Sequence, residues 1–438
     1  MSHYDADGIS SGAILSFLLS KLNRKYVLSI VTQLTKQKIK ELANEPYEYF
    51  IFADLGSSVI ESIGNTFDWR KKILILDHHE TDSTKQFSNI IHVNPHLCGI
   101  NGGEEISGSG VSYLFAREID ESIDEFSYLA LVGMLGDLQH NSIDSLNDYI
   151  VDLALKSGKV ERKKGLKLFG AQTKPLYKAL EHSTDPYIPY VTGSESGAIQ
   201  FLLELGINPK NERGWRRLVD LSEEEIKKLV AGIVIKRQSE ENPEDILGDI
   251  FILKDAPIES PFKDLREFAT LLNACGRMEK GYIGICACLN PNSERHKKEA
   301  LSVLESYRKE LVKGLKRIEE GIGLIKNERF AIIDGGEVIS PSIIGVITSI
   351  MSKSIFKKDD FVMGLANTED GFVKISLRKS VRKNADLRLI LSRIVDLVGD
   401  GEVGGHEGAA GALIPAEEKE RFIEPTSRIF PSTIINLL

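Results

Sequence analysis

The stretch KILILDHHE (72–80) joins an unbroken apolar run to an aspartate and two histidines. Two further apolar runs, YFIFAD (49–54) and IIHVN (90–94), lie on either side of it in the sequence. Their apolar residues hardly alternate with polar ones, which is typical of strands in a parallel sheet covered on both faces. Helical patterns at 11–22 and 36–43 precede them. Together these patterns predict an α/β domain with a doubly wound parallel sheet.

The whole chain has the composition of a globular protein. It has 438 residues and a formal net charge of −9, with 42% hydrophobic and 27% charged residues. This length allows two or three domains, and the composition excludes a disordered or fibrous protein. No apolar run approaches the ~18 to 20 residues of a membrane helix, and no signal-peptide pattern opens the sequence, so we expect no membrane partner. Four cysteines do not make a disulfide framework, which favours a cytoplasmic location.

The pattern along the chain predicts four segments. A strand at 26–31 and a long helix at 124–139 complete the first domain, and a long helical pattern at 293–326 predicts a connector helix. The last segment restarts the α/β alternation, with strands at 330–334, 361–367 and 371–380, helices at 341–353 and 384–399, and a glycine-rich loop leading into a short helix at 399–414. The segments are the first α/β domain (1–155), a mostly helical insertion (156–265), a segment with NACGR and the connector (266–327), and a smaller α/β domain (328–438).

Acidic and histidine side chains cluster where strands of the first domain end. The clusters are His3, Asp5 and Asp7; Asp54; Asp77, His78 and His79; and Asp137. A lone aspartate at a strand end is usually a helix cap or a turn residue. Four clusters at successive strand ends favour a metal site instead. Carboxylates suit Mn²⁺ and Mg²⁺, and imidazole shifts the preference toward Mn²⁺.

Six motifs carry a resemblance to a known family. They are HYDADGISSGA (3–13), Asp54, LDHHE (76–80), SGSGVSYL (107–114), GDLQ (136–139) and GGHEGAAGA (404–412). In this order they resemble the DHH phosphoesterase superfamily and, within it, the archaeal branch of the RecJ-like single-strand exonucleases. FATLLNACGRM (268–278) is similar to the Asn-Ala-x-Gly-Arg segment of RecJ. The resemblance implies a DHH catalytic domain at 1–155 and a DHHA1-type domain, which binds phosphate or nucleic acid, at 328–438.

This resemblance implies a site for two divalent cations, Mn²⁺ in the first place and Mg²⁺ as the alternative. The side chains expected to bind them are His3, Asp5, Asp7, Asp54, His78 and Asp137. One ion would be held by His3, Asp5 and Asp54, and the other by the remaining three, with the Asp54 carboxylate bridging the two. Asp77 would orient a histidine rather than bind an ion, and His79 would meet the substrate phosphate. The other histidines considered are interpreted as ordinary surface or packed residues: His92, His140 and His182.

The glycine-rich motif resembles the GGGH-type loop of the family's second domain. Gly404 and Gly405 would let the backbone approach a phosphate, and His406 would be directed at the scissile phosphate. The family triplet is incomplete here, because Val403 stands where the family has its first glycine. The expected catalytic side chains are therefore Asp54, His79 and His406.

A basic stretch precedes this motif. Ser376 and Arg378 resemble the Ser-x-Arg of RecJ nucleases that grips a terminal phosphate, and Arg277 of NACGR resembles a third member of that pocket. The guanidinium fork suits this task because it binds phosphate oxygens in pairs. The basic side chains of 372–393, opposed only by Asp386, are Lys374, Arg378, Lys379, Arg382, Lys383, Arg388 and Arg393. They predict a confined phosphate track, with a solvated helix face as the alternative.

The cysteines allow one competing interpretation. A zinc site would draw on Cys98, Cys275, Cys286 and Cys288, but the sequence has no CxxC pair. The last two lie in YIGICACL (282–289), an apolar run that resembles a strand. Buried, reduced thiols are the expected explanation.

The sequence therefore predicts a metal-dependent phosphodiesterase that acts as an exonuclease on single-stranded DNA or RNA, with the 5′→3′ direction favoured. Two alternatives stay open: a phosphoesterase for very short oligonucleotides or small nucleotides, and a replication scaffold with little activity that binds a GINS-type complex. Single-stranded nucleic acid is the expected partner, with a GINS-type complex as a second. Because His3 follows only two residues while such ligands normally follow a buried strand, we also expect the physiological protein to begin upstream of Met1.

Overall fold

The computed structural model contains two compact units. The residues described are 1–81, 85–139, 145–171, 173–183, 186–238, 243–326, 330–353, 356, 361–379, 385–399, 401–406 and 408–423, with only the backbone at 406. The first unit consists of Met1–Ala179, Glu212–Leu221 and Leu247–Glu305. The second consists of Leu180–Asn211, Ser222–Ile246 and Ser306–Leu438. None of the described helices is long and apolar enough to cross a membrane.

The first unit is built on a parallel sheet with the strand order β2-β1-β3-β4-β5. Its strands are β1 (Ser2–His3), β2 (Ile30–Val31), β3 (Tyr49–Ala53), β4 (Lys72–Leu76) and β5 (Ile90–Val93). Of the strand predicted at 26–31, only the last two residues pair. β1 is short but central, because Ser2 N donates to Ser29 O on one side and Ala53 N donates to Met1 O on the other.

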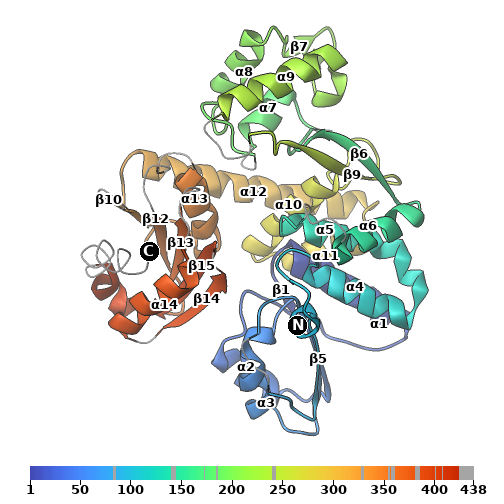
Figure 1. Cartoon of the computed structure of the whole chain (residues 1–438), viewed down its shortest axis with the longest axis vertical. Coiled ribbons are helices and arrows are strands. Elements are labelled where there is room, and N and C mark those ends of the chain that lie inside the picture. The colour runs from blue at the N-terminus through green and yellow to red at the C-terminus, as the bar shows by residue number, and fades with distance from the viewer. Residues whose placement is uncertain are drawn as a thin grey trace. The chain divides into compact units, whose positions relative to one another are not determined.

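Helices cover both faces of this sheet, as Figure 1 shows. The covering helices are α1 (Ala6–Lys21), α2 (Lys36–Asn44), α3 (Ile60–Thr66) and α4 (Gly108–Ile119). Helix α5 (Ser127–Gly136) packs on α1 and α4, and α6 (Leu146–Lys156) packs on α5. Phe52 and Ile75 point into a core with α2 and α3, whereas Ala53 and Leu76 belong to a core with α1, α4 and α5. Neighbours along a strand thus enter opposite cores, which explains the unbroken apolar runs and confirms the doubly wound α/β fold.

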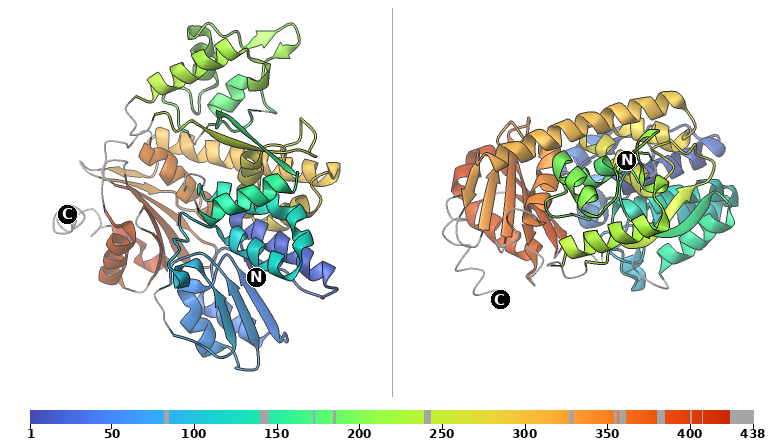
Figure 2. Two further views of the ribbon diagram at one scale, coloured as in Figure 1. Left: turned by 45° about the vertical axis from the view of Figure 1, so that its right-hand side comes forward. Right: turned by 90° about the horizontal axis from the view of Figure 1, so that it is seen from above.

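Two further helices, α10 (Leu265–Arg277) and α11 (Gly281–Leu289), share the core of α1 and α5. The expectation that 282–289 resembles a strand is wrong, because this run is α11. A short run that is apolar all round suits a buried helix as well as a buried strand, so periodicity cannot separate them. Cys275 and Cys288 are buried here as free thiols. The connector helix α12 (Glu294–Glu319) follows as one unbroken element (Figure 2).

The stretch predicted as a mostly helical insertion contains helices and two small ribbons. The helices are α7 (Leu176–Glu181), α8 (Glu195–Glu204) and α9 (Glu223–Lys236). The ribbons pair β6 (Val160–Leu166) with β9 (Leu247–Leu253) and β7 (Lys210–Asn211) with β8 (Gly214–Trp215). Short 3₁₀ turns lie at Ser57–Val59, Pro95–Cys98, Glu121–Phe126, Leu218–Asp220 and Ala416–Glu418. The third of these replaces the start of the helix predicted at 124–139.

The second unit contains a mixed sheet with the order β10-β11-β12-β13-β15-β14. Its strands are β10 (Leu324–Lys326), β11 (Phe330–Asp334), β12 (Phe361–Asn367), β13 (Phe372–Lys379), β14 (Glu402–His406) and β15 (Ala409–Pro415), and its helices are α13 (Pro341–Lys353) and α14 (Leu387–Val398). The short helix predicted after the glycine-rich loop is wrong, since the motif forms the antiparallel pair β14–β15. Buried Ala410, Ala412 and Ile414 alternate with less buried residues along β15, a period of two that a helix does not have.

Candidate metal centre and phosphate-binding strands

The candidate metal centre lies at the carboxyl ends of β1, β3 and β4. His3 ends β1, Asp54 follows β3, and His78 comes two residues after β4. Because β2 lies on one side of β1 and β3 on the other, the chain changes direction in the sheet between β1 and β3. In open α/β sheets this switch point is where ligands bind. His3, Asp54 and His78 are therefore brought to one end of one sheet. The expectation that every cluster follows a strand is wrong for Asp137, which follows helix α5.

One group of possible ligand atoms comes from His3, Asp5 and Asp54. His3 Nδ1 lies 2.9 Å from Asp5 Oδ2 and 3.5 Å from Asp54 Oδ2. Asp5 is also the N-cap of α1, since its Oδ1 accepts a hydrogen bond from Gly8 N at 3.0 Å. One carboxylate oxygen thus fixes the helix start, while the other faces the site.

A second group comes from Asp7, His78 and Asp137. His78 Nε2 lies 3.7 Å from Asp7 Oδ2 and 3.5 Å from Asp137 Oδ2. The same nitrogen lies 3.3 Å from Asp54 Oδ1. Asp54 therefore faces both groups, one with each oxygen, as expected of a bridging carboxylate.

The buried atoms of Asp54 and His78 fit bound cations. Both carboxylate oxygens of Asp54 and Nε2 of His78 are buried and make no hydrogen bond within the described part of the chain. Such atoms are costly to bury without a partner. Asp54 also has a φ of +60°, a backbone conformation that residues other than glycine rarely adopt. A carboxylate held in this way fits a pair of cations, which would satisfy the orphaned oxygens and nitrogen.

Backbone groups hold Asp7 and His78. Asp7 Oδ2 accepts a hydrogen bond from Gly108 N at 2.6 Å, and its Oδ1 accepts one from Ser109 N at 2.9 Å. His78 Nδ1 lies 2.7 Å from Gly102 O. Because a carbonyl oxygen can only accept, Nδ1 carries the proton and Nε2 is left as the ligand atom. Sequence reasoning missed these roles, although the SGSG motif that supplies the first two N–H groups was visible.

Asp77 and His79 form a pair beside these groups, and His79 also belongs to a third possible ligand group with Asp54 and His78. Asp77 accepts hydrogen bonds from Ser57 N and His78 N, both at 2.8 Å, and from His79 Nδ1 at 2.7 Å. Burial alone would raise the pKa of Asp77, but the charge and hydrogen bond of His79 hold it well below its usual range. The His79 side chain is 52% exposed and stays open to a ligand. His92, interpreted as an ordinary residue, contacts Ser57 Oγ through Nε2 at 2.9 Å.

The carboxylates and imidazoles compete for protons when no cation is present. Burial and the charge of Asp54 raise the pKa of Asp7 to about 7. Burial, with Asp7 and Asp5, also raises the pKa of Asp137 well above its usual range. Burial opposes the charged form of His78, but Asp54 outweighs it and raises the pKa of that imidazole. The metal-free site therefore holds protons that a cation would displace.

The expected phosphate-binding residues of the second unit lie on neighbouring strands. In the register of the sheet, Ser376 of β13 pairs with Gly411 of β15, which pairs with Gly404 of β14. Two residues further along the strands, Arg378, Ala409 and His406 pair in the same way, on the same face of the sheet as the first row. The side chain of His406 lies outside the described part. Gly405 has a φ of +113°, a conformation open mainly to glycine.

Helix α13 covers the face of β13 that carries Ser376 and Arg378. A Cβ on Gly345 would lie 3.1 Å from Ser376 Oγ and 3.6 Å from Arg378 Nη2. Ser376 is buried and Arg378 half-buried, with Arg378 Nη1 donating to Leu377 O at 2.8 Å. Arg277, the expected third member of this pocket, ends α10 in the first unit.

Several predicted residues fall outside the described residues: His140, Arg382 and Lys383. His182 follows α7 in the second unit.

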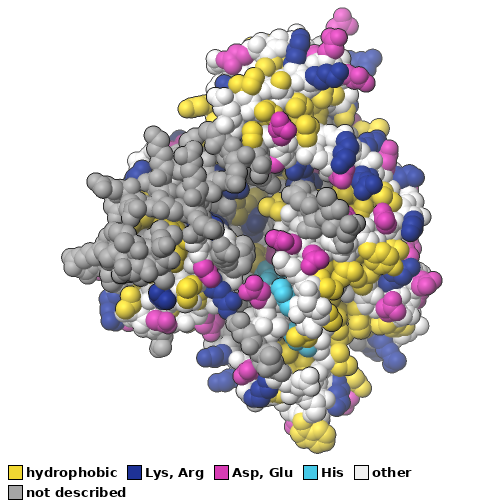
Figure 3. All heavy atoms as spheres, viewed as in Figure 1, with side chains coloured by type: hydrophobic (Ala, Val, Ile, Leu, Met, Phe, Trp, Pro, Cys, Tyr) yellow, Lys and Arg dark blue, Asp and Glu magenta, His cyan; other side chains and the backbone are white. Residues whose placement is uncertain are grey.

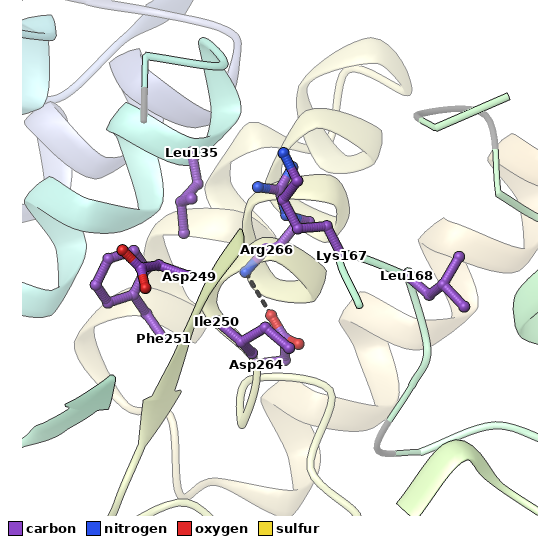
Figure 4. Close-up of a pocket in the computed structure, with 8 residues that line it drawn as sticks. All are labelled: Leu135, Lys167, Leu168, Asp249, Ile250, Phe251, Asp264 and Arg266. Carbon is purple, nitrogen blue, oxygen red and sulfur yellow. Dashed lines mark hydrogen bonds between the residues drawn. The ribbon is translucent and has the colours of Figure 1, made fainter. Parts of the chain in front are cut away.

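Figure 3 shows histidine and acidic side chains side by side at the surface. A pocket between β9 and the start of α10, drawn in Figure 4, contains none of the expected site residues. There Asp264 caps α10 by accepting a hydrogen bond from Arg266 N at 2.9 Å.

Three family models match the chain. The DHH family N-terminal domain matches residues 1–134, the DHH-CID domain matches 168–249, and the DHHA1 domain matches 329–430. A relative from Methanocaldococcus jannaschii, named as an uncharacterized protein, is 32% identical over 98% of this chain and 92% of its own length. The first and third models include every motif on which the RecJ-like resemblance was based, apart from NACGR and GDLQ.

Two solved structures show the same fold. CDC45 from Entamoeba histolytica superposes with a TM-score of 0.66 at 13% identity, over 98% of this chain and 94% of that one. RecJ from Thermus thermophilus in complex with Mn²⁺ superposes with a TM-score of 0.56 at 16% identity, over 98% of this chain and 51% of that one. The chain thus spans about half the length of that RecJ. The family models place the chain in the DHH superfamily of metal-dependent phosphoesterases, and the solved structures show that its fold is RecJ-like.

Proposed function

We propose that this protein is a two-metal phosphodiesterase that removes nucleotides from an end of single-stranded DNA or RNA, with the 5′ end favoured. The observation that carries the proposal is the buried Asp54 carboxylate, whose two oxygens face His3 and His78 and form no hydrogen bond with any described residue. A single buried carboxylate shared in this way suits two cations rather than one. The likeness to a RecJ crystallised with Mn²⁺ supports Mn²⁺ as the first choice, with Mg²⁺ as the alternative.

The residues of the chain have separate tasks in this proposal. His3, Asp5 and Asp54 would hold one cation, and Asp7, Asp54, His78 and Asp137 would hold the other. When bound, such a pair of cations activates water and stabilises the charge of the phosphate. His79, fixed through Nδ1 by Asp77, presents its exposed edge to the phosphate. Ser376 and Arg378 would bind the terminal phosphate of the strand, and Arg277 would assist them.

Labelled single strands test this function directly. DNA and RNA strands labelled at the 5′ or the 3′ end are incubated with Mn²⁺, with Mg²⁺ or with EDTA. We expect stepwise shortening from the 5′ end with either cation and none with EDTA. A series of strand lengths, down to dinucleotides, separates the exonuclease from a phosphoesterase for very short oligonucleotides. Shortening from the 3′ end would overturn the polarity, and activity in EDTA would overturn the metal assignment.

A second candidate is a replication scaffold that binds a GINS-type complex. The observation that favours it is the CDC45 likeness, which extends over nearly the whole of both chains and concerns the fold alone. Catalysis and scaffolding are compatible on one chain. Co-elution of the purified protein with a GINS-type complex would support this role, and equal co-elution of the Asp54→Asn variant would separate it from catalysis. Independent elution of the two would refute it.

A further inference from the structure

We propose that Asn273 is a positioning residue of the metal centre, which holds the turn that carries Asp5 and Asp7 against helix α10. This inference rests on the proposed function, because it assumes that these two carboxylates bind cations. It assigns to the NACGR segment a task besides the phosphate contact expected of Arg277. Asn273 would act through the backbone of the turn and not by touching a cation or the substrate.

The central contact is a hydrogen bond between distant parts of the chain. Ala6 N donates to Asn273 Oδ1 at 3.0 Å, across 267 positions of sequence. Ala6 lies between Asp5 and Asp7 and is the first residue of α1. The first N–H groups of a helix have no acceptor within the helix and need one from elsewhere. Asp5 takes the N–H of Gly8, and Asn273 takes that of Ala6.

Close backbone approach shows that this turn and α10 are fitted together. A Cβ on Gly276 would overlap the carbonyl oxygen of Tyr4, so α10 can come this near only with glycine at that position. A Cβ on Gly136 would lie 2.8 Å from Ala6 Cβ and 3.8 Å from Asn273 Nδ2. Because Gly136 directly precedes Asp137, the start of α1 and the end of α5 both meet α10 beside Asn273.

Helix α10 is a firm support for this contact. Its start is capped by Asp264, and burial raises the pKa of that carboxyl to about 6. Phe268 and Leu272 are fully buried in the core shared with α1 and α5. Ligands of a metal centre must be held within about 0.5 Å of their working positions, which loosely held turns cannot do. Asn273 thus connects a fixed helix to the turn that has to be held.

The test measures Mn²⁺ affinity without nucleic acid. Asn273→Leu keeps the size of the side chain and removes the acceptor, whereas Asn273→Asp keeps an acceptor oxygen. Thr270→Val is the matched control, because the Thr270 hydroxyl donates to Arg266 O in its own helix. By calorimetric titration of EDTA-treated protein, we expect Asn273→Leu to weaken Mn²⁺ binding about tenfold or more. Asn273→Asp should restore most of the affinity, and Thr270→Val should leave it unchanged.

The outcomes separate positioning from a general structural role. Unchanged Mn²⁺ affinity of a folded Asn273→Leu protein would overturn the inference, even if its metal-free form unfolds at a lower temperature. A loss of affinity that Asn273→Asp does not restore would also overturn it. If Asn273→Leu does not fold, Asn273→Ser carries the same comparison. Normal Mn²⁺ binding by the unmodified protein without hydrolysis would refute the proposed function and leave this inference standing.

Discussion

Oδ1 of Asp54 lies 3.3 Å from Nε2 of His78, and both atoms are buried without a hydrogen bond within the described residues. Two side chains that follow adjacent parallel strands thus point polar atoms at the same space. Without a cation, a proton on Nε2 of His78 is the alternative partner for the Asp54 oxygen. The charge of Asp54 accordingly raises the pKa of His78. The relationship makes the centre sensitive to charge, to pH and to metal removal.

The Asp54→Asn variant should lose hydrolysis by at least about 10³-fold, because it removes the charge shared by both cations. The rate is measured on a labelled single strand with saturating Mn²⁺. Asp152→Asn is the matched control, since Asp152 is exposed on α6. Near-normal turnover of purified Asp54→Asn protein would contradict the two-metal assignment.

Mn²⁺ affinity should rise with pH between about 6 and 8. The pKa of Asp7 lies at about 7 without a cation, and the pKa values of His3 and His78 are raised, so all three hold protons at lower pH. A cation needs the deprotonated ligands, and its binding must therefore release protons. Titration calorimetry in two buffers of different ionisation enthalpy measures this release. An affinity independent of pH, with no proton release, would be inconsistent with the proposed ligands.

A 5′-phosphorylated strand should be degraded faster than a 5′-hydroxyl strand, and Arg378→Ala should remove the difference. A hydrogen bond to a charged group contributes about 1.5–3 kcal/mol, which corresponds to roughly tenfold to a hundredfold in rate. Arg421→Ala, which removes an exposed charge outside the basic stretch, is the control and should keep the preference. Equal rates on both strands with the unmodified protein would rule out the 5′-phosphate pocket.

Gly345→Val should also remove the preference for a 5′-phosphate while Mn²⁺ affinity stays unchanged. A Cβ at this position already approaches Ser376 Oγ to 3.1 Å, and the two methyl groups of valine would fill the space over Ser376 and Arg378. The ratio of rates on the two strands and a calorimetric Mn²⁺ titration are measured on the same preparation. A variant that keeps the preference would show that the phosphate binds elsewhere.

The sequence alone determined the parallel sheet and the residues gathered at its end. Unbroken apolar runs such as KILIL are a local property, and the carboxyl ends of parallel strands meet at one edge, so the sequence pattern is sufficient to place the clusters at Asp54 and Asp77–His79 together. The strands predicted at 361–367 and 371–380 correspond to β12 and β13, and the turn with Asp370 and Gly371 between the two apolar runs favours their antiparallel pairing. The residues of the candidate site came from this reasoning and from the family motifs.

Tertiary structure decided what depends on distant partners. Only the fold shows that 282–289 is a helix inside the first core. Only the fold shows, too, that Ser376 and Gly404 lie on either side of Gly411 in the sheet. Two hydrogen bonds that support the ligands join distant residues. Gly108 N donates to Asp7 across 101 positions, and Ala6 N donates to Asn273 across 267 positions. Local periodicity carries no information about such contacts, because they form only when separate helices pack. The sequence therefore determined which side chains meet at the strand ends, and packing decided how firmly each of them is held.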